Sequence, residues 1–406
     1  MTYREALAWL YGTQRFGIKL GLENVQRLLL ELNVPAPDQQ IVHVAGTNGK
    51  GSVCAMIDSI ARVAGYRTGL FTSPHLVTYR ERIRVNGEMI PPNEVAAGLT
   101  ALRDRIRSWD PHPTFFEITT ALALVHFKNA NCDLLVLETG LGGRLDATNA
   151  VTPVVSVITP IGYDHEKWLG NTLEEIAGEK AGIIKANVPV VSAKQEAAAE
   201  KIVCARASEC DAPLDFVTGT YTASPIGLGG RHQQENAALA IAALRAANIA
   251  VTDDAIIHGL ATVDWPARFQ RWDERTIIDG AHNPAGARVL ANTWRAEFGT
   301  ERATIILAVL REKNVAEICR HLAPIAARFI LPQIRSERAI PPNELAPHLS
   351  SITPSLPYSI RPLLPDALAS ARTYADRILI TGSLHFAGEA LATLRGDPDA
   401  LEDCAQ

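Results

Sequence analysis

Residues 41–52 read Ile41-Val-His-Val-Ala-Gly-Thr-Asn-Gly-Lys-Gly-Ser52, and this stretch decides the fold. The run 41–45 predicts a strand of a sheet, and residues 52–64 predict a helix that Gly65 closes. A glycine-rich turn between a strand and a helix is the context in which proteins bind phosphate groups. The turn at 46–51 therefore predicts a phosphate-binding loop.

Each kind of residue in this loop has a chemical task if the loop binds a nucleotide. Glycines let backbone N–H groups face phosphate oxygens, Lys50 reaches the outer phosphates, and Ser52 can ligate Mg²⁺. The spacing departs from the usual GxxxxGK[ST] pattern, because Gly51 separates the lysine from the serine. The alternative is a glycine-rich turn with a solvated lysine, which the flanking strand and helix disfavour. We expect contacts to the nucleotide from Thr47, Asn48, Gly49, Lys50, Gly51 and Ser52.

The bulk properties limit the possible classes of protein. A chain of 406 residues exceeds the size at which one hydrophobic core usually stops growing, so two domains are expected. A net charge of -5 without a long run of either sign disfavours nucleic acid as a partner. Six scattered cysteines indicate a reducing compartment without disulfides or a thiolate metal site. With no signal segment and no long uncharged apolar stretch, we expect a soluble, cytoplasmic protein that does not bind membranes.

Apolar β-rich runs alternate with helical patterns along the chain, which is typical of parallel α/β sheets. An opening helical segment has its apolar residues from Val25 to Leu32 on one face. The pattern restarts after Trp265-Pro266, so we expect domains at 1–266 and 273–406. Further strands are expected at 68–71, 134–137, 154–158, 188–191, 276–278, 304–309, 328–331 and 377–380, with a late helix at 236–247.

Two other clusters carry side chains that suit a cation. Glu138 follows the strand at 134–137, and a carboxylate at the carboxyl end of a parallel strand points into the crevice where such sheets bind ligands. Asp164 and His165 lie six residues past the strand at 154–158, where a neutral imidazole can ligate a cation. The alternatives are a helix cap or surface charge for Glu138 and a structural role for His165.

Eight motifs follow one another along the chain: Gly46 to Ser52, Ser73-Pro-His-Leu76, Glu81-Arg-Ile-Arg-Val-Asn-Gly87, Glu138 to Asn149, Glu179-Lys-Ala-Gly182, Pro266-Ala-Arg-Phe269, Asp279-Gly-Ala-His-Asn-Pro284 and Thr381-Gly-Ser-Leu-His385. In their order and spacing they resemble the folylpolyglutamate synthase and dihydrofolate synthase family, over about Lys19 to Glu389. This family is of the Mur-ligase type, which implies an α/β fold with a P-loop ATPase domain built on a parallel-rich sheet and a smaller Rossmann-like C-terminal domain.

The resemblance implies a role for each matching residue. Phe115 and Phe116 could instead be core aromatics, Asp279 could be a helix cap, and Arg268 could only pair with a carboxylate. The loop Leu310-Arg-Glu-Lys313 departs from the family's Asp-Lys pair, which weakens any assignment there. The implied metal ligands are Ser52, Ser73, Glu138, His165 and Lys180; the implied ATP residues are Asn236, Arg268 and Asp279. His282 and Ser383 would bind glutamate, and Phe115, Phe116, Glu117 and Arg144 would lie near the pterin and aminobenzoate of the folate.

The implied reaction is ATP-dependent ligation of L-glutamate to a folate-type carboxylate through an acyl phosphate, giving ADP and phosphate. Dihydropteroate, a tetrahydrofolyl-polyglutamate or both could be the acceptor. Two Mg²⁺ ions are implied, the enzyme is expected to be a monomer, and Lys50, His165, Lys180, Asp279 and His282 would be catalytic. One alternative is a Mur-type amino-acid ligase for a non-folate carboxylate, but such ligases carry a nucleotide-sugar domain before the phosphate loop, and 45 residues precede Gly46. A regulator without catalysis is disfavoured, because candidate metal and glutamate residues are present.

Lys180 lies in the middle of an apolar helix face. On a helix beginning near Thr172, the residues Leu173, Ile176, Ala177, Lys180 and Ile184 share one face, and Glu174, Glu175 and Glu179 lie away from it. Position alone favours a snorkelling lysine whose ammonium reaches water. The resemblance implies instead that CO₂ carbamylates Lys180, which then binds the second Mg²⁺ together with His165.

Overall fold

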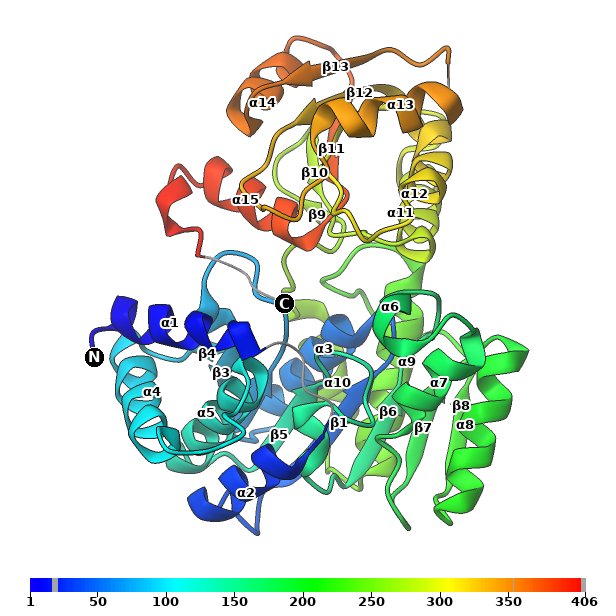
Figure 1. The fold of residues 1–406 in the computed structure, drawn as a ribbon. Helices are drawn as coiled ribbons and strands as arrows, with labels where there is room; N and C mark the ends of the chain where they lie inside the picture. The colour runs from blue at the N-terminus through cyan, green and yellow to red at the C-terminus, as the bar shows by residue number, and fades with distance from the viewer. Residues whose placement is uncertain (17–20, 353, 403–406) are drawn as a thin grey trace.

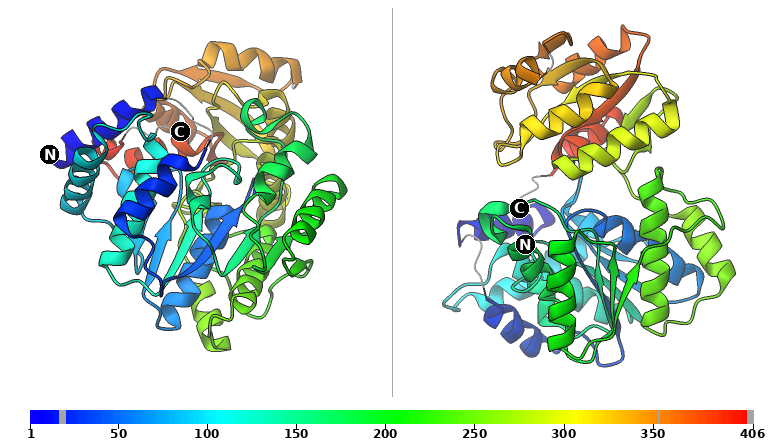
Figure 2. Two further views of the ribbon diagram at one scale, coloured as in Figure 1. Left: turned by 60° about the horizontal axis from the view of Figure 1, so that its bottom comes forward. Right: turned by 90° about the vertical axis from the view of Figure 1, so that its right-hand side faces the viewer.

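The computed structural model describes residues 1–16, 21–352 and 354–402, which form two α/β parts stacked on each other (Figures 1 and 2). The N-terminal part contains α1 to α10, and the C-terminal part contains β9 to the 3₁₀ helix η5. Each part has its own sheet with helices on both faces. Within the described ranges no helix is both long and apolar enough to cross a membrane.

The first sheet has eight strands in the order β4-β3-β2-β5-β1-β6-β7-β8. All pairs from β2 to β8 are parallel, and β3 and β4 add an antiparallel edge. Val44 of β1 pairs with both Glu138 and Val157, so the carboxyl ends of three central strands lie together. The strands are β1 (Gln40–Ala45), β2 (Thr68–Phe71), β3 (Ile83–Val85), β4 (Glu88–Met89), β5 (Leu134–Glu138), β6 (Val155–Ile158), β7 (Val190–Ala193) and β8 (Leu214–Val217).

Helix α3 is the buried centre of this part, because its residues from Gly51 to Ala61 are almost fully covered by the sheet, α9 and α10. Helices α1, α2, α4 and α5 enclose a second core on the other face. The helices are α1 (Tyr3–Gly12), α2 (Glu23–Leu32), α3 (Lys50–Val63), α4 (Pro92–Ile106), α5 (Phe115–Asn129), α6 (Glu166–Leu169), α7 (Leu173–Ala181), α8 (Ala197–Glu209), α9 (Arg231–Ala246) and α10 (Asp253–Thr262), with 3₁₀ helices η1 (Thr13–Phe16), η2 (Tyr79–Arg82) and η3 (Ala147–Ala150).

The second sheet has the order β13-β12-β11-β14-β10-β9, and only β9 is antiparallel to its neighbour. One core lies between this sheet and helices α11 to α13, and another lies beneath α14 and α15. The elements are β9 (Gln270–Arg271), β10 (Thr276–Ile278), α11 (Pro284–Phe298), β11 (Ala303–Leu307), α12 (Val315–Leu322), η4 (Ala323–Ile325), β12 (Ala326–Pro332), α13 (Pro342–Ile352), β13 (Tyr358–Arg361), α14 (Leu364–Arg372), β14 (Arg377–Thr381), α15 (Leu384–Leu394) and η5 (Pro398–Ala400).

The predicted α/β fold with two parts is confirmed, and the differences concern element ends and short strands. The phosphate-loop helix begins at Lys50 instead of residue 52, and the late helix begins at Arg231 instead of residue 236. The strand expected at 188–191 lies at Val190–Ala193. The short strands β3, β4, β8, β9 and β13 were not predicted, because two to four residues carry little periodicity.

Candidate active site

The phosphate loop occupies the turn between β1 and α3. Gly46 and Gly49 have φ angles of 143° and 93°, a region that favours glycine. A Cβ atom at Gly46 would lie 1.9 Å from the hydroxyl oxygen of Thr159, so a larger residue does not fit. The amides of Thr47 and Asn48 donate to the carbonyl oxygen of Pro160. The first amide of α3 that donates to a backbone carbonyl of the preceding turn is that of Val53, which donates to Gly49. The amides of residues 50–52 are therefore left at the helix N-terminus, the position at which helices bind phosphate.

Two lysines lie against this loop from different helices. The ammonium of Lys50 donates to the carbonyl oxygens of Gly46 and Thr47, at 3.2 Å and 3.4 Å. The ammonium of Lys180 on α7 donates to the same oxygen of Gly46 at 2.9 Å. Lys180 is only 5% exposed, and burial together with the charge of Lys50 lowers its pKa to about 7. At neutral pH a large share of Lys180 is therefore an uncharged amine.

Ser73 and Glu138 form a pair of oxygen donors beside the loop. The backbone amide of Ser73 donates to the Glu138 carboxylate at 3.1 Å, and both side chains are buried. Burial raises the pKa of Glu138, against the opposing effect of Lys50. The hydroxyl oxygen of Ser73 is buried without a hydrogen-bond partner. A carboxylate next to an unsatisfied hydroxyl fits a hard divalent cation.

Ser52 and Asn236 are joined by Gln233, a residue that the sequence did not single out. The Gln233 side chain donates to the Ser52 hydroxyl at 3.4 Å and accepts a hydrogen bond from Asn236 at 3.0 Å. A Cβ atom at Gly49 would lie 2.8 Å from the Asn236 amide oxygen. The structure thus brings the predicted nucleotide residue of α9 against the phosphate loop.

Arg268 lies in the connection between the two parts. Its side chain donates to the carbonyl oxygen of Ala267 at 3.0 Å. Burial lowers the pKa of Arg268, while the neighbouring carboxylates of Asp279 and Glu138 act in the opposite direction. Both oxygens of Asp279 accept backbone hydrogen bonds, from Phe269 and Ala281, each at 2.8 Å. Asp279 therefore stabilises its own turn, as the capping alternative predicts, and also faces Arg268.

Asp164 connects the N-terminal part to the C-terminal part. Its carboxylate contacts Lys313 at 2.5 Å, Asn283 at 3.1 Å and His282 at 3.5 Å. Burial alone would raise the pKa of Asp164, but the hydrogen bond from His282 and the charge of Lys313 hold it well below its usual range. Neighbouring His165, whose side chain is 36% exposed, has its pKa lowered to about 4, first by its partial burial and then by Lys313 and His282, against the effect of Asp164. Its imidazole is therefore neutral at physiological pH.

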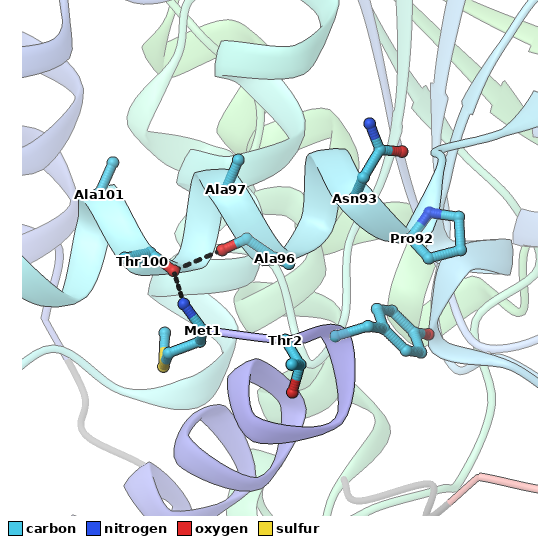
Figure 3. A pocket seen from close by; sticks show the side chains of 9 residues that line it. Met1, Thr2, Pro92, Asn93, Ala96, Ala97, Thr100 and Ala101 are labelled. Carbon is cyan, nitrogen blue, oxygen red and sulfur yellow. Dashed lines mark hydrogen bonds between the residues drawn. The ribbon is translucent and has the colours of Figure 1, made fainter.

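A cavity of about 30 Å³ collects several of the predicted residues, with lining from Gly51, Ser73, Glu138, Arg268 and Leu384. Two larger hollows lie elsewhere on the protein. One of about 640 Å³, shown in Figure 3, lies between residues 1–3 and α4, where the amino group of Met1 donates to Thr100. The candidate site is therefore a narrow space between the two parts.

Comparison with known proteins agrees with this arrangement. The Mur ligase middle domain matches residues 44–198, and the Mur ligase glutamate ligase domain matches residues 267–384. The dihydrofolate synthase/folylpolyglutamate synthase of Bacillus subtilis is 36% identical, over 97% of this chain and 99% of its own length. The chain belongs to the folylpolyglutamate synthase and dihydrofolate synthase family.

Solved structures of the family share the whole fold. Escherichia coli FolC in complex with DHPP and ADP is 32% identical, with a TM-score of 0.86 over 96% of this chain and 98% of that one. A bifunctional folylpolyglutamate synthase/dihydrofolate synthase with Mn, AMPPNP and L-glutamate bound is also 32% identical, with a TM-score of 0.85 over the same shares of the two chains.

The residues matched to the folate side of this family have different surroundings. Phe115 is buried and stacks on Tyr11, with ring centroids 5.6 Å apart. Glu117 accepts hydrogen bonds from Thr114 and caps α5. Arg144 is exposed and pairs with Glu179 at 2.8 Å. Phe116 is partly buried and lies so close to Gly140 that a Cβ atom there would be 2.5 Å from the ring.

The residues matched to the glutamate side lie at the start of helices of the C-terminal part. The Ser383 hydroxyl accepts a hydrogen bond from the amide of Phe386 and caps α15. His282 contacts the carbonyl oxygen of Gly280 at 2.8 Å through Nδ1. His385 was not predicted, although it belongs to a quoted motif; burial and the charges of Arg338, Arg82 and His282 lower its pKa to about 4. The imidazole of His385 is therefore uncharged at neutral pH.

Proposed function

We propose that this chain is an ATP-dependent carboxylate–amine ligase that joins L-glutamate to dihydropteroate, to a tetrahydrofolyl-polyglutamate, or to both. The observation that carries the proposal is the narrow space between the two parts, where the Ser73–Glu138 pair meets Arg268 and Leu384 beside the phosphate loop. Lys180 contacts the same loop through Gly46. The chain is similar over nearly its full length to enzymes named for this reaction, including one solved with DHPP and ADP and one with L-glutamate.

The chemistry requires activation of the acceptor. An amine cannot displace oxide from a carboxylate at neutral pH, so the carboxylate must first take the γ-phosphoryl group of ATP and become an acyl phosphate. Lys50, at the amino end of α3, stabilises the charge on the transferring phosphoryl group. The α-amine of L-glutamate then attacks the acyl carbon, and phosphate leaves. Closure of the two parts excludes the water that would hydrolyse the acyl phosphate.

Metal binding divides between two sites in this proposal. Divalent cations, when bound, neutralise charge on the phosphate groups. Ser52, Ser73 and Glu138 supply hydroxyl and carboxylate oxygens for the first Mg²⁺. Neutral His165 and a carbamate on Lys180 would supply the ligands of the second Mg²⁺. The low pKa of buried Lys180 supports this, because CO₂ reacts with the uncharged amine.

The remaining assignments follow the placement of the residues. Asn236 and Arg268 hold the nucleotide, with Asp279 beside Arg268. His282 and Ser383 bind L-glutamate. Phe115, Phe116, Glu117 and Arg144 lie near the folate in this proposal, as the family resemblance implies. We assign 1–266 to the ATPase domain with the folate site and 273–406 to the glutamate-ligase domain, in a monomeric cytoplasmic enzyme.

The direct test is ligation by the purified chain. ADP release in the presence of Mg²⁺ and ATP should depend on both L-glutamate and a pterin acceptor, and mass spectrometry should show a product heavier by one glutamyl residue. Dihydropteroate and tetrahydrofolate are assayed separately to define the acceptor. A nucleotide-sugar amino-acid conjugate serves as the comparison substrate. Turnover with that substrate and none with either pterin would reject the folate assignment.

A further inference from the structure

Residues Leu76 to Tyr79 belong to the N-terminal part but are held by the C-terminal part. Val77 is buried in the core beneath α15, together with Ile278 and Phe386. Helix α15 also touches the backbone here, because a Cβ atom at Gly388 would lie 1.9 Å from the carbonyl oxygen of Leu76. These residues therefore form a docking segment between the two parts.

Glu402 closes this contact from the other side. Its carboxylate accepts hydrogen bonds from the amide of Tyr79 at 2.6 Å, the hydroxyl of Thr78 at 3.0 Å and the hydroxyl of Tyr3 at 3.1 Å. Its own amide donates to the carbonyl oxygen of Val77 at 2.8 Å. Leu401 packs on the same core as Val77. The tail after η5, coloured red in Figure 1, thus returns from the C-terminal part to the side of α1.

Two carboxylates divide the amides of the docking segment between them. Glu81, from the N-terminal part, accepts from the amides of Leu76, Val77 and Thr78 at 2.7 to 3.0 Å. Glu402, from the C-terminal part, accepts from the next amide, that of Tyr79. Hydrogen bonds to an ionised carboxylate are the strong class of such bonds. The C-terminal part therefore holds the last amide of the segment, while the N-terminal part holds the first three.

The docking segment continues directly into a candidate metal ligand. Ser73 lies three residues before Leu76, with its amide fixed to Glu138 and its hydroxyl buried without a partner. We propose that Glu402 is a positioning residue that couples seating of the C-terminal part to the placement of the Ser73 hydroxyl. The inference rests on the proposed function for the metal role of Ser73, while the contacts of Glu402 are independent of it.

Hydrogen exchange in the protein without metal or nucleotide tests the anchoring. In Glu402→Ala, amides in a peptide covering residues 76–82 should exchange about tenfold faster than in the wild type, while a peptide covering β6 should not change. In Glu402→Gln, which keeps an acceptor oxygen but loses the charge, the exchange rate of residues 76–82 should lie between those of the wild type and Glu402→Ala. Asp399→Ala is the matched control, because Asp399 is an exposed acidic residue of the same tail. Unchanged exchange in Glu402→Ala would overturn the anchoring.

Kinetics then test the coupling to the metal site. The Mg²⁺ concentration for half-maximal turnover should rise about fivefold in Glu402→Ala, with kcat at saturating Mg²⁺ within about twofold of the wild type. A chain ending at Glu402 should behave like the wild type, and a chain ending at Ala400 should behave like Glu402→Ala. Faster exchange with an unchanged Mg²⁺ requirement would reject the coupling. A wild type without ligase activity would reject the proposed function, and the exchange result would still decide the anchoring.

Discussion

Lys50 and Lys180 share one acceptor, since their ammonium groups lie 3.2 Å and 2.9 Å from the carbonyl oxygen of Gly46. Two cations at one carbonyl repel each other, and this repulsion adds to burial in lowering the pKa of Lys180 to about 7. A carbamate at Lys180 would replace the repulsion with attraction to Lys50. The phosphate loop would then lie beside the Lys50 ammonium and beside a Lys180 carbamate that can bind a metal ion.

We expect Lys180→Ala to lower ligase turnover by roughly 100-fold or more, because the anion at the second metal is lost. A small carboxylate such as acetate should restore part of the activity by occupying the vacated oxygen position. ¹³C NMR with labelled CO₂ should show a carbamate carbon in the wild type and none in the variant. A bare ammonium at Lys180 in a high-resolution map of the Mg-ATP complex would contradict this prediction.

Lys50→Ala should lower ligase turnover by about 1000-fold or more and leave the fold intact. The ammonium of Lys50 donates to two backbone carbonyl oxygens of its own loop, those of Gly46 and Thr47, so its loss removes little packing. Circular dichroism and thermal melting measure the fold, and ADP release at saturating Mg-ATP measures activity. Turnover within severalfold of the wild type would remove Lys50 from the mechanism.

Arg268→Ala should raise the KM for ATP by about tenfold or more, because this partly buried guanidinium lies in the connection where the two parts meet and feels the charges of Asp279 and Glu138. Lys194→Ala, which removes an exposed cation of the N-terminal part, is the control and should change KM by less than about twofold. Initial rates over a range of ATP concentrations give both values. Equal effects of the two substitutions would argue against a nucleotide role for Arg268.

Lys313→Ala should weaken the seating of the C-terminal part, because the Lys313–Asp164 pair joins the two parts and each side chain is 8% exposed. Without Lys313, Asp164 keeps its contacts to Asn283 and His282 but loses its closest cation, and separation of the parts relieves this loss by hydrating the carboxylate. The radius of gyration from small-angle X-ray scattering should therefore increase. Arg311→Ala is the control, since the nearby Arg311–Glu344 pair is exposed. An unchanged radius for Lys313→Ala would show that the pair does not hold the parts together.

His43 should make the fold sensitive to acid. It is fully buried beside the Thr148 hydroxyl, at 2.8 Å, and burial lowers its pKa from 6.5 to about 3. Above pH 6.5 the folded and unfolded chains both hold neutral His43; below it only the unfolded chain gains the proton. Stability is therefore lost as the pH falls from 6.5 toward 3, by about 1.4 kcal/mol per pH unit from this residue.

The check compares urea unfolding of the wild type and His43→Gln between pH 7 and pH 5. The variant should lose less stability over this range, whereas His258→Gln, at an exposed position of α10, should follow the wild type. Equal pH dependence of the unfolding free energy in the wild type and in His43→Gln would exclude His43 as the source of the acid sensitivity.

The sequence predicted the parts of the site that local patterns encode. The phosphate loop follows from a strand, a glycine-rich turn and a helix. The spacing of apolar residues on α7 places the stem of Lys180 on the core, but the snorkelling alternative that position alone favoured is wrong, because the ammonium is buried against Gly46. The pairing of Val44 with Glu138 then places this carboxylate beside the loop, as a parallel sheet requires.

Contacts between distant segments have no such local pattern. Gln233 reaches Ser52 across 181 residues, Lys313 reaches Asp164 across 149, and Glu402 reaches Tyr3 across 399. Lys313 even lies in the loop that departs from the family pattern. Each of these side chains is an ordinary polar residue in the sequence, and its role arises only when the two parts meet.

The return of the tail to Tyr79 also limits how the molecule can open. A rigid body fixed at one point can turn about any axis through it, whereas one fixed at two points can turn only about the line between them. The C-terminal part is attached through the linker before β9 and again through Glu402. Opening is then a hinge rotation about that line, and it must break the contact of Asp164, just before α6, with Lys313. In Figure 1, α6 and the tail lie on opposite sides of the molecule.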